Sequence, residues 1–294
     1  MGKSPGGEQH AQGLDHVGIA GPDLFALAAI YERLGFLLTP LARHSGKRTP
    51  DGPVVPFGTG NRCIMLRQGY LELIAIVDPG AFSNTLDRFL ARYAGIHILA
   101  LDVADADSNL ARLHRAGFAV PGIAYLERPV DDADPTGPRA KFARLPLPDA
   151  PEGRIQLIQH LTREAIWQER FMTHPNGAVA LADVVLAVAD PAEAAARFSR
   201  LAGQAVVPDP VGGFALDLPR GRVRLVPAAA LEKIFPGVVA PVLPYVAGIS
   251  LQTSDQTAGI TRIAAAQGIA TRAAPGGVLV PPEAAGGAAL RFLA

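Results

Sequence analysis

Four residues in the first half of this 294-residue chain have side chains that bind metals or move protons, and they recur in two similar segments. His16 and His97 each lie in a short apolar stretch. Glu72 and Gln156 each lie in the middle of a later apolar stretch. Two histidines and a carboxylate form a common ligand set for a divalent metal that keeps open positions for substrate. The repeat therefore predicts one metal site shared by two modules.

The surroundings of Glu72 also favour a bound cation. Residues 70–77 predict a strand in which Glu72 shares its face with apolar side chains, and this strand carries no Lys or Arg. Burying an unpaired carboxylate is costly, so a metal ion is the expected partner. The alternative is a buried ion pair with a distant arginine such as Arg62 or Arg144.

The elements that must position these residues follow one order four times: a strand, a helix and three further strands. In the first copy, strand 14–20 precedes a helix that Asp23 opens and Gly35 ends. The Pro- and Gly-rich segment 40–60 is interpreted as a functional or flexible loop, and strands are expected at 61–67 and 70–77, joined by a tight turn at Gln68 and Gly69.

The later copies begin near residues 96, 181 and 245. Because a single unit has one apolar face that it cannot bury alone, the units are expected to pair. The predicted fold is α+β, with four βαβββ modules paired into two halves with curved mixed sheets. The predicted organisation is a disordered tail (1–13), an N-terminal domain with the site (14–160), a linker (161–178) and a degenerate C-terminal domain (179–294).

Composition narrows the function classes. Hydrophobic residues make up 49% of the chain, and 27 basic residues balance 27 acidic ones, so no excess of positive charge supports a nucleic-acid partner. Neither a signal peptide nor a membrane span is found in the sequence, which predicts a cytoplasmic protein without a membrane partner. The single cysteine, Cys63, lies in an apolar strand and is interpreted as a buried, inert thiol.

Four motifs together resemble the vicinal oxygen chelate superfamily, which includes glyoxalase I, extradiol dioxygenases and bleomycin- and fosfomycin-resistance proteins. The nearest likeness is to its glyoxalase-like branch. The resemblance covers most of the chain, is strongest over residues 14–188, and rests on segments 14–17 (LDHV), 58–61 (GTGN), 70–74 (YLELI) and 174–178 (HPNGA).

The resemblance implies that ligands come from the first and last strands of each module. Carried over, these positions are His16, Glu72, His97 and Gln156, which would hold a divalent ion of iron, manganese, zinc, nickel or cobalt. Gln156 departs from the family pattern, in which a second carboxylate stands, so it is either a weak ligand or a group that orients substrate.

The second half gives an internal comparison. The counterparts of the four positions are Asp183, Arg224, about Ala247 and about Arg291. These residue types do not make a metal site, and Asp183 with an arginine predicts a salt bridge there instead. The working site is therefore expected in the first half.

The function that the resemblance implies is a metal-dependent lyase or isomerase acting on a small oxygen-bearing substrate, with Glu72 as the catalytic residue. One alternative is an Fe(II) extradiol-type dioxygenase. The other is a metal-free protein that sequesters a small molecule, with His16 and His97 hydrogen-bonded to Glu72 or Gln156. A monomer or a homodimer is expected.

Several other polar residues remain open. His174 is interpreted as a structural residue, and Asn61 as a turn cap. Both His44 and His160 are within reach of the site if their segments approach it. Four residues around the second long segment either meet an anionic substrate or lie on the surface: Tyr125, Arg128, Arg139 and Lys141.

Overall fold

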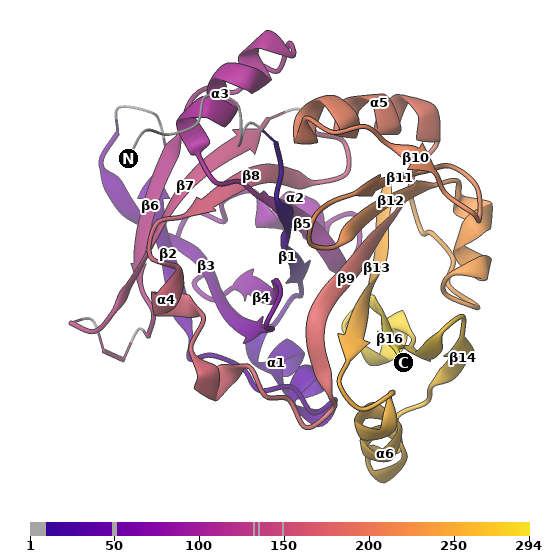
Figure 1. The fold of residues 1–294 in the computed structure, drawn as a ribbon. Coiled ribbons are helices and arrows are strands. Elements are labelled where there is room, and N and C mark those ends of the chain that lie inside the picture. The colour runs from indigo at the N-terminus through magenta and orange to yellow at the C-terminus, as the bar shows by residue number, and fades with distance from the viewer. Residues whose placement is uncertain (1–9, 49–51, 132, 135, 149) are drawn as a thin grey trace, which may run out of the picture.

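The computed structural model describes residues 10–48, 52–131, 133–134, 136–148 and 150–294. Four βαβββ modules follow one another (Figure 1). Module one contains β1 (Gly13–Ala20), α1 (Leu24–Arg33), β2 (Ala42–Lys47), β3 (Val54–Met65) and β4 (Tyr70–Ile76). After α2 (Leu86–Leu90), module two contains β5 (Gly95–Asp102), α3 (Ala106–Arg115), β6 (Ala124–Pro129), β7 (Arg139–Leu147) and β8 (Arg154–His160).

The connector to the second half contains α4 (Arg163–Ile166) and the 3-10 turn η1 (Glu169–Phe171). Module three contains β9 (Ala178–Ala187), α5 (Pro191–Ala202), β10 (Val207–Pro208), β11 (Phe214–Asp217) and β12 (Arg222–Val226). After the 3-10 segment η2 (Ala228–Lys233), module four contains β13 (Tyr245–Thr253), α6 (Ala258–Gln267), β14 (Arg272–Ala274), β15 (Gly277–Val280), η3 (Pro282–Ala284) and β16 (Ala289–Leu293).

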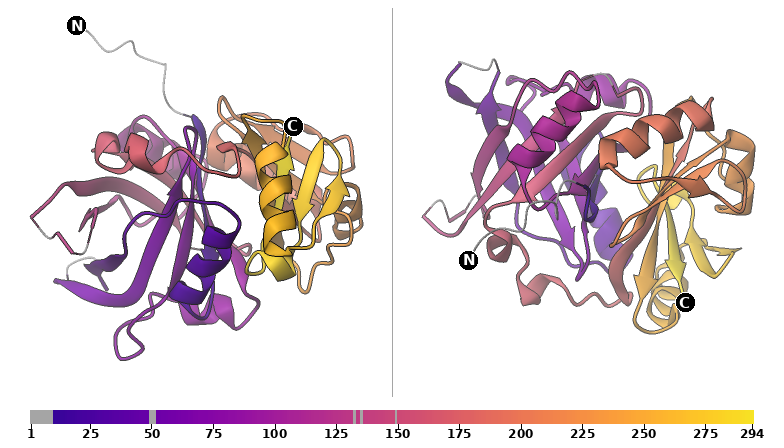
Figure 2. Two further views of the ribbon diagram at one scale, coloured as in Figure 1. Left: turned by 90° about the horizontal axis from the view of Figure 1, so that it is seen from below. Right: turned by 45° about the horizontal axis from the view of Figure 1, so that its top comes forward.

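The two halves have the same strand order. It is β2-β3-β4-β1-β5-β8-β7-β6 in the first half and β10-β11-β12-β9-β13-β16-β15-β14 in the second. In each half the first strands of the two modules lie antiparallel at the centre, and each pairs in parallel with the last strand of its own module. The halves lie side by side and are joined where Val246 of β13 pairs with Ile96 of β5 (Figure 2). The predicted α+β fold of four paired modules is confirmed.

Local sequence signals explain the helix boundaries. The Asp23 carboxylate accepts the backbone N–H groups of Phe25 and Ala26 at the start of α1, and Gly35 follows the helix with a positive φ of 80°. Leu24, Leu27, Ala28 and Tyr31 of α1 are buried against the sheet. Asp190 caps α5 in the same way, so these modules are built by the same local rules.

One sequence prediction about the first module is wrong. Residues 42–47 and 54–60 are not a loop, because β2 and the first half of β3 pair there as antiparallel strands of a hairpin. Pro56 and Gly58 disguised the strand, since both residues are rare inside strands. The hairpin brings His44 to the concave face of the sheet. Of the predicted disordered tail 1–13, residues 1–9 lie outside the described part of the chain, whereas Ala11 is buried and donates its N–H to the Ala202 carbonyl.

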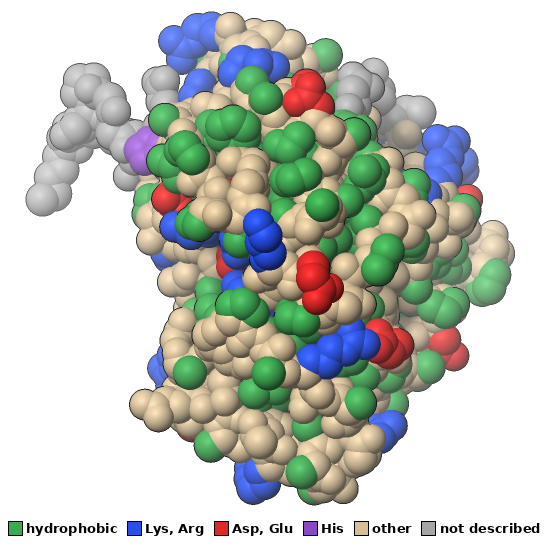
Figure 3. Space-filling view, turned by 90° about the vertical axis from the view of Figure 1, so that its right-hand side faces the viewer, with side chains coloured by type: hydrophobic (Ala, Val, Ile, Leu, Met, Phe, Trp, Pro, Cys, Tyr) green, Lys and Arg blue, Asp and Glu red, His purple; other side chains and the backbone are tan. Residues whose placement is uncertain are grey.

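The two concave faces differ in what fills them. In the second half, the chain around η2 covers the concave face with Leu231, Ile234 and Phe235, which pack on Val185 of β9 and Ala289 of β16. In the first half the corresponding face keeps a cavity. Nowhere in the described ranges is there a helix of the length and apolarity needed to cross a membrane. Figure 3 shows Lys and Arg side chains dispersed over the face of the second half, without a basic stripe.

Candidate active site

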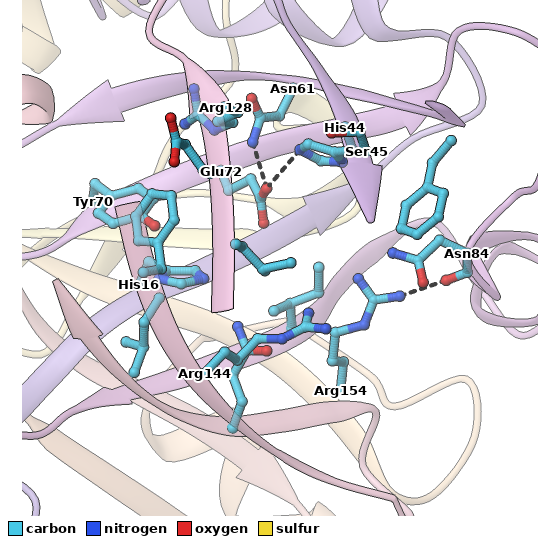
Figure 4. Close-up of a pocket in the computed structure, with 17 residues that line it drawn as sticks. His16, His44, Ser45, Asn61, Tyr70, Glu72, Asn84, Arg128, Arg144 and Arg154 are labelled. Atoms are coloured by element: carbon cyan, nitrogen blue, oxygen red, sulfur yellow. Dashed lines mark hydrogen bonds and ion pairs between the residues drawn. The ribbon is translucent and has the colours of Figure 1, made fainter. Parts of the chain in front are cut away.

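A cavity lies on the concave face of the first half and encloses about 760 Å³ of empty space, its opening to solvent included. Its lining combines two carboxylates, Glu72 and the surface-paired Glu127, with histidines, arginines and apolar side chains (Figure 4). The polar residues used below come from β1, β2, β3, β4, β6, β7 and β8: His16, His44, Asn61, Glu72, Arg128, Arg144, Arg154 and Gln156. The site thus draws on both modules of this half.

Glu72 is held in the cavity by two polar neighbours. Asn61 Nδ2 donates a hydrogen bond of 2.5 Å to Glu72 Oε1, and His44 Nε2 lies 3.7 Å from the same oxygen. Burial opposes ionisation of this carboxyl, but His44, His16 and the Asn61 hydrogen bond outweigh burial, and its pKa is lowered. Glu72 is therefore a carboxylate at neutral pH. Arg62 and Arg144, the two arginines proposed from the sequence as ion-pair partners of Glu72, form no salt bridge with it in the described structure. Arg62 pairs with Glu32 at 2.9 Å instead.

His44 is neutral where it faces Glu72. Its Nδ1 lies 2.9 Å from the Thr59 hydroxyl oxygen, and burial lowers its pKa to about 4 despite the neighbouring carboxylate. The sequence predicts a loop at His44 and leaves open whether this residue reaches the site. Its position became clear only with the β2–β3 hairpin.

His16 is oriented by the adjacent Asp15. The Asp15 carboxylate accepts hydrogen bonds from His16 Nδ1 at 2.6 Å and from His160 Nε2 at 2.9 Å. Burial raises the pKa of Asp15, but the two histidines lower it by more, so its pKa lies well below the usual value. The His16 ring also stacks on the Tyr70 ring, with 4.5 Å between centroids. With Nδ1 committed to Asp15, His16 has Nε2 left for the cavity.

The structure does not bring His97 together with His16, Glu72 and Gln156. The cavity is lined by its neighbour Ile98. The His97 ring stacks on those of Tyr93 and Phe89, at 3.9 and 5.3 Å, and its Nε2 donates to the Tyr93 carbonyl at 2.8 Å. Desolvation lowers its pKa to about 4, so the ring is a neutral packing residue.

A one-residue error in the repeat explains the misplaced histidine. Glu72 pairs with Gly18 across β1 and β4, and Gln156 pairs with Ala100 across β5 and β8. If Glu72 and Gln156 are equivalent, Gly18 matches Ala100, and two residues earlier His16 matches Ile98. A shift of one residue in a strand moves a side chain to a different face, so the predicted equivalence of His16 and His97 was wrong.

The residues of the cavity do not fit the predicted metal site. The position of the second histidine holds Ile98, and the position of the second carboxylate holds the neutral Gln156, whose Oε1 is buried without a hydrogen-bond partner. Within the described ranges, no cluster of three or more His, Cys, Asp and Glu side chains could hold a metal ion. Three arginines, Arg128, Arg144 and Arg154, line the same cavity and disfavour a divalent cation there.

The other polar residues considered in the sequence divide between the cavity, the surface and the core. Arg128 lines the cavity, whereas Arg139 and Lys141 pair with Glu127 at the surface and Tyr125 is 66% exposed. His174 is structural, as predicted, because its Nδ1 accepts the Leu37 N–H at 3.0 Å and its Nε2 donates to the Met65 carbonyl at 2.8 Å. Cys63 is buried, and desolvation raises the pKa of its thiol to about 12.

Arg154 was missed as a site residue in the sequence. The signal was present, because Arg154, Gln156 and Ile158 alternate along β8 on the face that lines the cavity. Asn61 was also misread, since it binds Glu72 from inside β3 and does not cap a turn.

The second half contains the predicted salt bridge. Arg291 Nη2 lies 3.1 Å from Asp183 Oδ2, and Arg224 lies 3.9 Å from the same oxygen. Arg224 also forms two hydrogen bonds with the buried Asp209, at 2.7 and 2.8 Å. The counterpart of the cavity is thus closed by ion pairs as well as by apolar side chains.

Comparisons with known proteins agree with this architecture. A hypothetical protein from Staphylococcus aureus superposes with a TM-score of 0.61 at 14% identity, covering 95% of this chain and 98% of that one. The Mn(II)-bound glyoxalase from Novosphingobium aromaticivorans gives 0.55 at 14% identity, with 96% and 82% coverage. A variant of 4-hydroxymandelate synthase from Streptomyces coelicolor gives 0.55 at 16% identity, with 91% and 78% coverage.

At these identities the structural neighbours show a shared fold. The search among curated proteins found no match. The model of the glyoxalase-like domain family matches residues 14–202, which contain the whole cavity and the first strand and helix of the second half. The chain therefore belongs to the glyoxalase-like domain family, within the vicinal oxygen chelate superfamily.

Proposed function

We propose that this protein is an enzyme that moves a proton on a small oxygen-bearing organic substrate in the first-half cavity, as a lyase or an isomerase. One observation carries the proposal: an ionised carboxylate and an oriented histidine, Glu72 and His16, line the same partly enclosed cavity. Each is held by a second side chain, Asn61 for Glu72 and Asp15 for His16. Such support keeps acid–base groups in productive positions.

The chemistry follows from the ionised Glu72 and from the orientation that Asp15 gives to His16. Glu72 takes a proton from a carbon next to a carbonyl group, the electron pair of the broken C–H bond forms a C=C bond, and the carbonyl π pair moves onto the oxygen. Glu72 then returns the proton to the same or to a neighbouring atom. His16, whose Nδ1–H is directed at Asp15, accepts a hydroxyl proton of the substrate at Nε2. Positively charged side chains in the cavity stabilise the developing oxyanion.

Specific residues of the cavity disfavour the alternative functions. A metal-dependent lyase and an Fe(II) dioxygenase both need the ligand set that Ile98 and Gln156 interrupt. The sequestration hypothesis predicts that His16 and His97 hydrogen-bond to Glu72 or Gln156. Instead, His16 bonds to Asp15 and His97 to the Tyr93 carbonyl. Glu72 is held by Asn61.

Hydrogen–deuterium exchange tests the proposal without knowledge of the natural substrate. A panel of small 2-hydroxy ketones and 2-oxo acids is incubated with the protein in D2O, and loss of the C–H signal next to the carbonyl is followed by proton NMR. We expect exchange with the wild type and a fall of about 10²- to 10⁴-fold in Glu72→Gln and in His16→Gln.

The matched control is Glu32→Gln, which removes a carboxylate that is paired with Arg62 at the surface, away from the cavity. Its exchange rate is expected to equal that of the wild type. Equal rates in Glu72→Gln and the wild type would contradict the proposal. Binding of panel members without any exchange would overturn the proposed function and favour the hypothesis of a small-molecule-sequestering protein.

A further inference from the structure

Two arginines reach the cavity from neighbouring strands of module two. Arg144 lies on β7 and Arg154 on β8, and both line the cavity with Gln156 (Figure 4). The Arg154 guanidinium is fixed by the segment that precedes α2, whose Asn84 also lines the cavity. Its Nη2 donates to the Asn84 carbonyl at 2.5 Å and to the Thr85 hydroxyl at 3.3 Å. The group is therefore positioned before any ligand arrives.

Among the residues that the structure describes, no carboxylate forms a salt bridge with Arg144 or Arg154. Arg144 Nε is buried without a hydrogen-bond partner. Desolvation and the nearby charge of Arg154 lower the pKa of Arg144 to about 10, against a weaker opposing effect of Glu72. Two like charges with an unpaired donor destabilise the ligand-free cavity.

The filled concave face of the second half offers a comparison, because its arginines are paired with carboxylates. There Arg224 is paired with Asp209, and Arg291 with Asp183, on the corresponding concave face. Phe235 of the covering segment also lies against the Arg291 guanidinium, 5.7 Å from it. The same architecture thus neutralises its arginines where the cavity is filled and leaves them unpaired where it is open.

We infer that Arg144 and Arg154 bind the anionic head group of the substrate, so that the cavity selects a small organic anion with an apolar body. The inference rests on the proposed function for the direction of the ligand, with its reactive carbon toward Glu72. A carboxylate and a phosphate monoester share the required chemistry, since both accept the donors of a guanidinium. Gln156 Oε1 adds an acceptor for a hydroxyl group, and Ile98, Leu126 and Phe142 contact the apolar part.

Calorimetric titration with three probes of similar shape tests the inference by binding alone. The probes are phenylacetate, phenyl phosphate and the uncharged phenylacetamide, each added to the full chain at neutral pH and low salt. We expect at least one anion to bind about tenfold or more tightly than the amide. Preference for phenylacetate indicates a carboxylate substrate, and preference for phenyl phosphate indicates a phosphate monoester.

Substitutions assign the preference to the two arginines. Arg144→Gln and Arg154→Gln are each expected to weaken binding of the favoured anion by about tenfold or more and to leave binding of the amide unchanged. Arg144→Lys keeps the charge and is expected to recover part of the loss. Arg262→Gln, on the exposed surface of α6, is the matched control and should bind as the wild type does. Circular dichroism and thermal unfolding confirm that each variant is folded.

The outcome separates this inference from the proposed function. Glu72→Gln should lose exchange activity yet bind the anion at least as tightly as the wild type, because a nearby negative charge is removed. Anion selectivity without exchange supports the inference and rejects the proposed base. Equal affinity for anion and amide, no binding of either anion, or unchanged anion affinity in both arginine variants would overturn the inference.

Discussion

Asp15 and His16 are neighbours in one strand, and yet their side chains hydrogen-bond to each other, with 2.6 Å between Oδ1 and Nδ1. Side chains of successive strand residues normally point to opposite faces. The pairing of β1 with β5 shifts register between Leu14 and His16, and this irregularity accompanies the contact. A local departure from regular pairing thus supplies the orienting group of the site.

The first prediction concerns this pair. Asp15→Asn should lower the exchange rate by about 10- to 100-fold, less than loss of His16 itself, because an amide no longer fixes the imidazole in one tautomer. The nitrogen-15 shifts of the His16 ring should change together with the rate. An unchanged pH–rate profile and unchanged ring shifts in a folded Asp15→Asn variant would remove Asp15 from the site.

The second prediction concerns metal binding. The strand register makes Ile98 and Gln156 the positions that separate this cavity from a four-ligand site. We therefore expect the wild type to bind Mn(II) or Zn(II) weakly, and the double variant Ile98→His with Gln156→Glu to bind at least about tenfold more tightly, because it completes two histidines and two carboxylates. Calorimetry on chelator-treated protein measures both. Stoichiometric, tight metal binding by the wild type that His16→Gln abolishes would refute this assignment.

The third prediction concerns pH. His97 has a pKa of about 4 in the folded protein against 6.5 for an ordinary histidine. Below pH 6.5 the unfolded chain takes up a proton that the folded chain does not, so the free energy of unfolding falls as the pH drops from 6.5 to 4. The contribution of His97 is up to ~3 kcal/mol. His44 and His174 act in the same direction.

His97→Gln isolates this contribution, because the glutamine amide can still donate to the Tyr93 carbonyl but does not titrate in this range. Urea unfolding between about pH 7 and about pH 4.5 should show a shallower loss of stability than in the wild type. The exchange rate should stay within about twofold of the wild type, since His97 lies outside the cavity. A large fall in the exchange rate of His97→Gln would contradict the placement of His97 outside the site.

The fourth prediction concerns the second half. Asp183→Asn should lower the free energy of unfolding by about 3 kcal/mol, because Arg291 then stays buried without its counter-charge. The exposed pair of Arg272 and Glu283 provides a control, and Glu283→Gln should cost less than about 1 kcal/mol. Chemical unfolding measures both. Similar small effects would mean that the buried network contributes little to stability.

The fold could largely be predicted from the sequence, because each module repeats the same local signals. The Asp caps, the glycines after the helices and the apolar strands are contiguous features, and the structure has the predicted elements at most of these places. The loop predicted over segment 40–60 was wrong because the Pro- and Gly-rich composition, with Pro56 and Gly58 inside β3, hid the pairing of β2 with β3.

The site was less accessible to sequence reasoning. Alternation along residues 70–77 supports Glu72, whereas the repeat and the family resemblance supply His16, and both residues line the cavity. His97 could not be separated from Ile98, since the register between β1 and β5 contains shifts that no alternation rule reports. Arg144 and Arg154 are proposed to bind an anion because they lack carboxylate partners among the described residues. Only the three-dimensional arrangement shows this.

The two concave faces are filled in different ways. The second is closed by its own chain around η2, so its contribution to stability does not depend on any solute. If the concave face of the first half binds an anion at its unpaired arginines, the free energy of unfolding rises by RT ln(1 + [L]/Kd). The thermal midpoint of the whole protein would then rise with the concentration of the correct compound. A library of organic acids could be ranked by melting temperature alone, before any turnover is known.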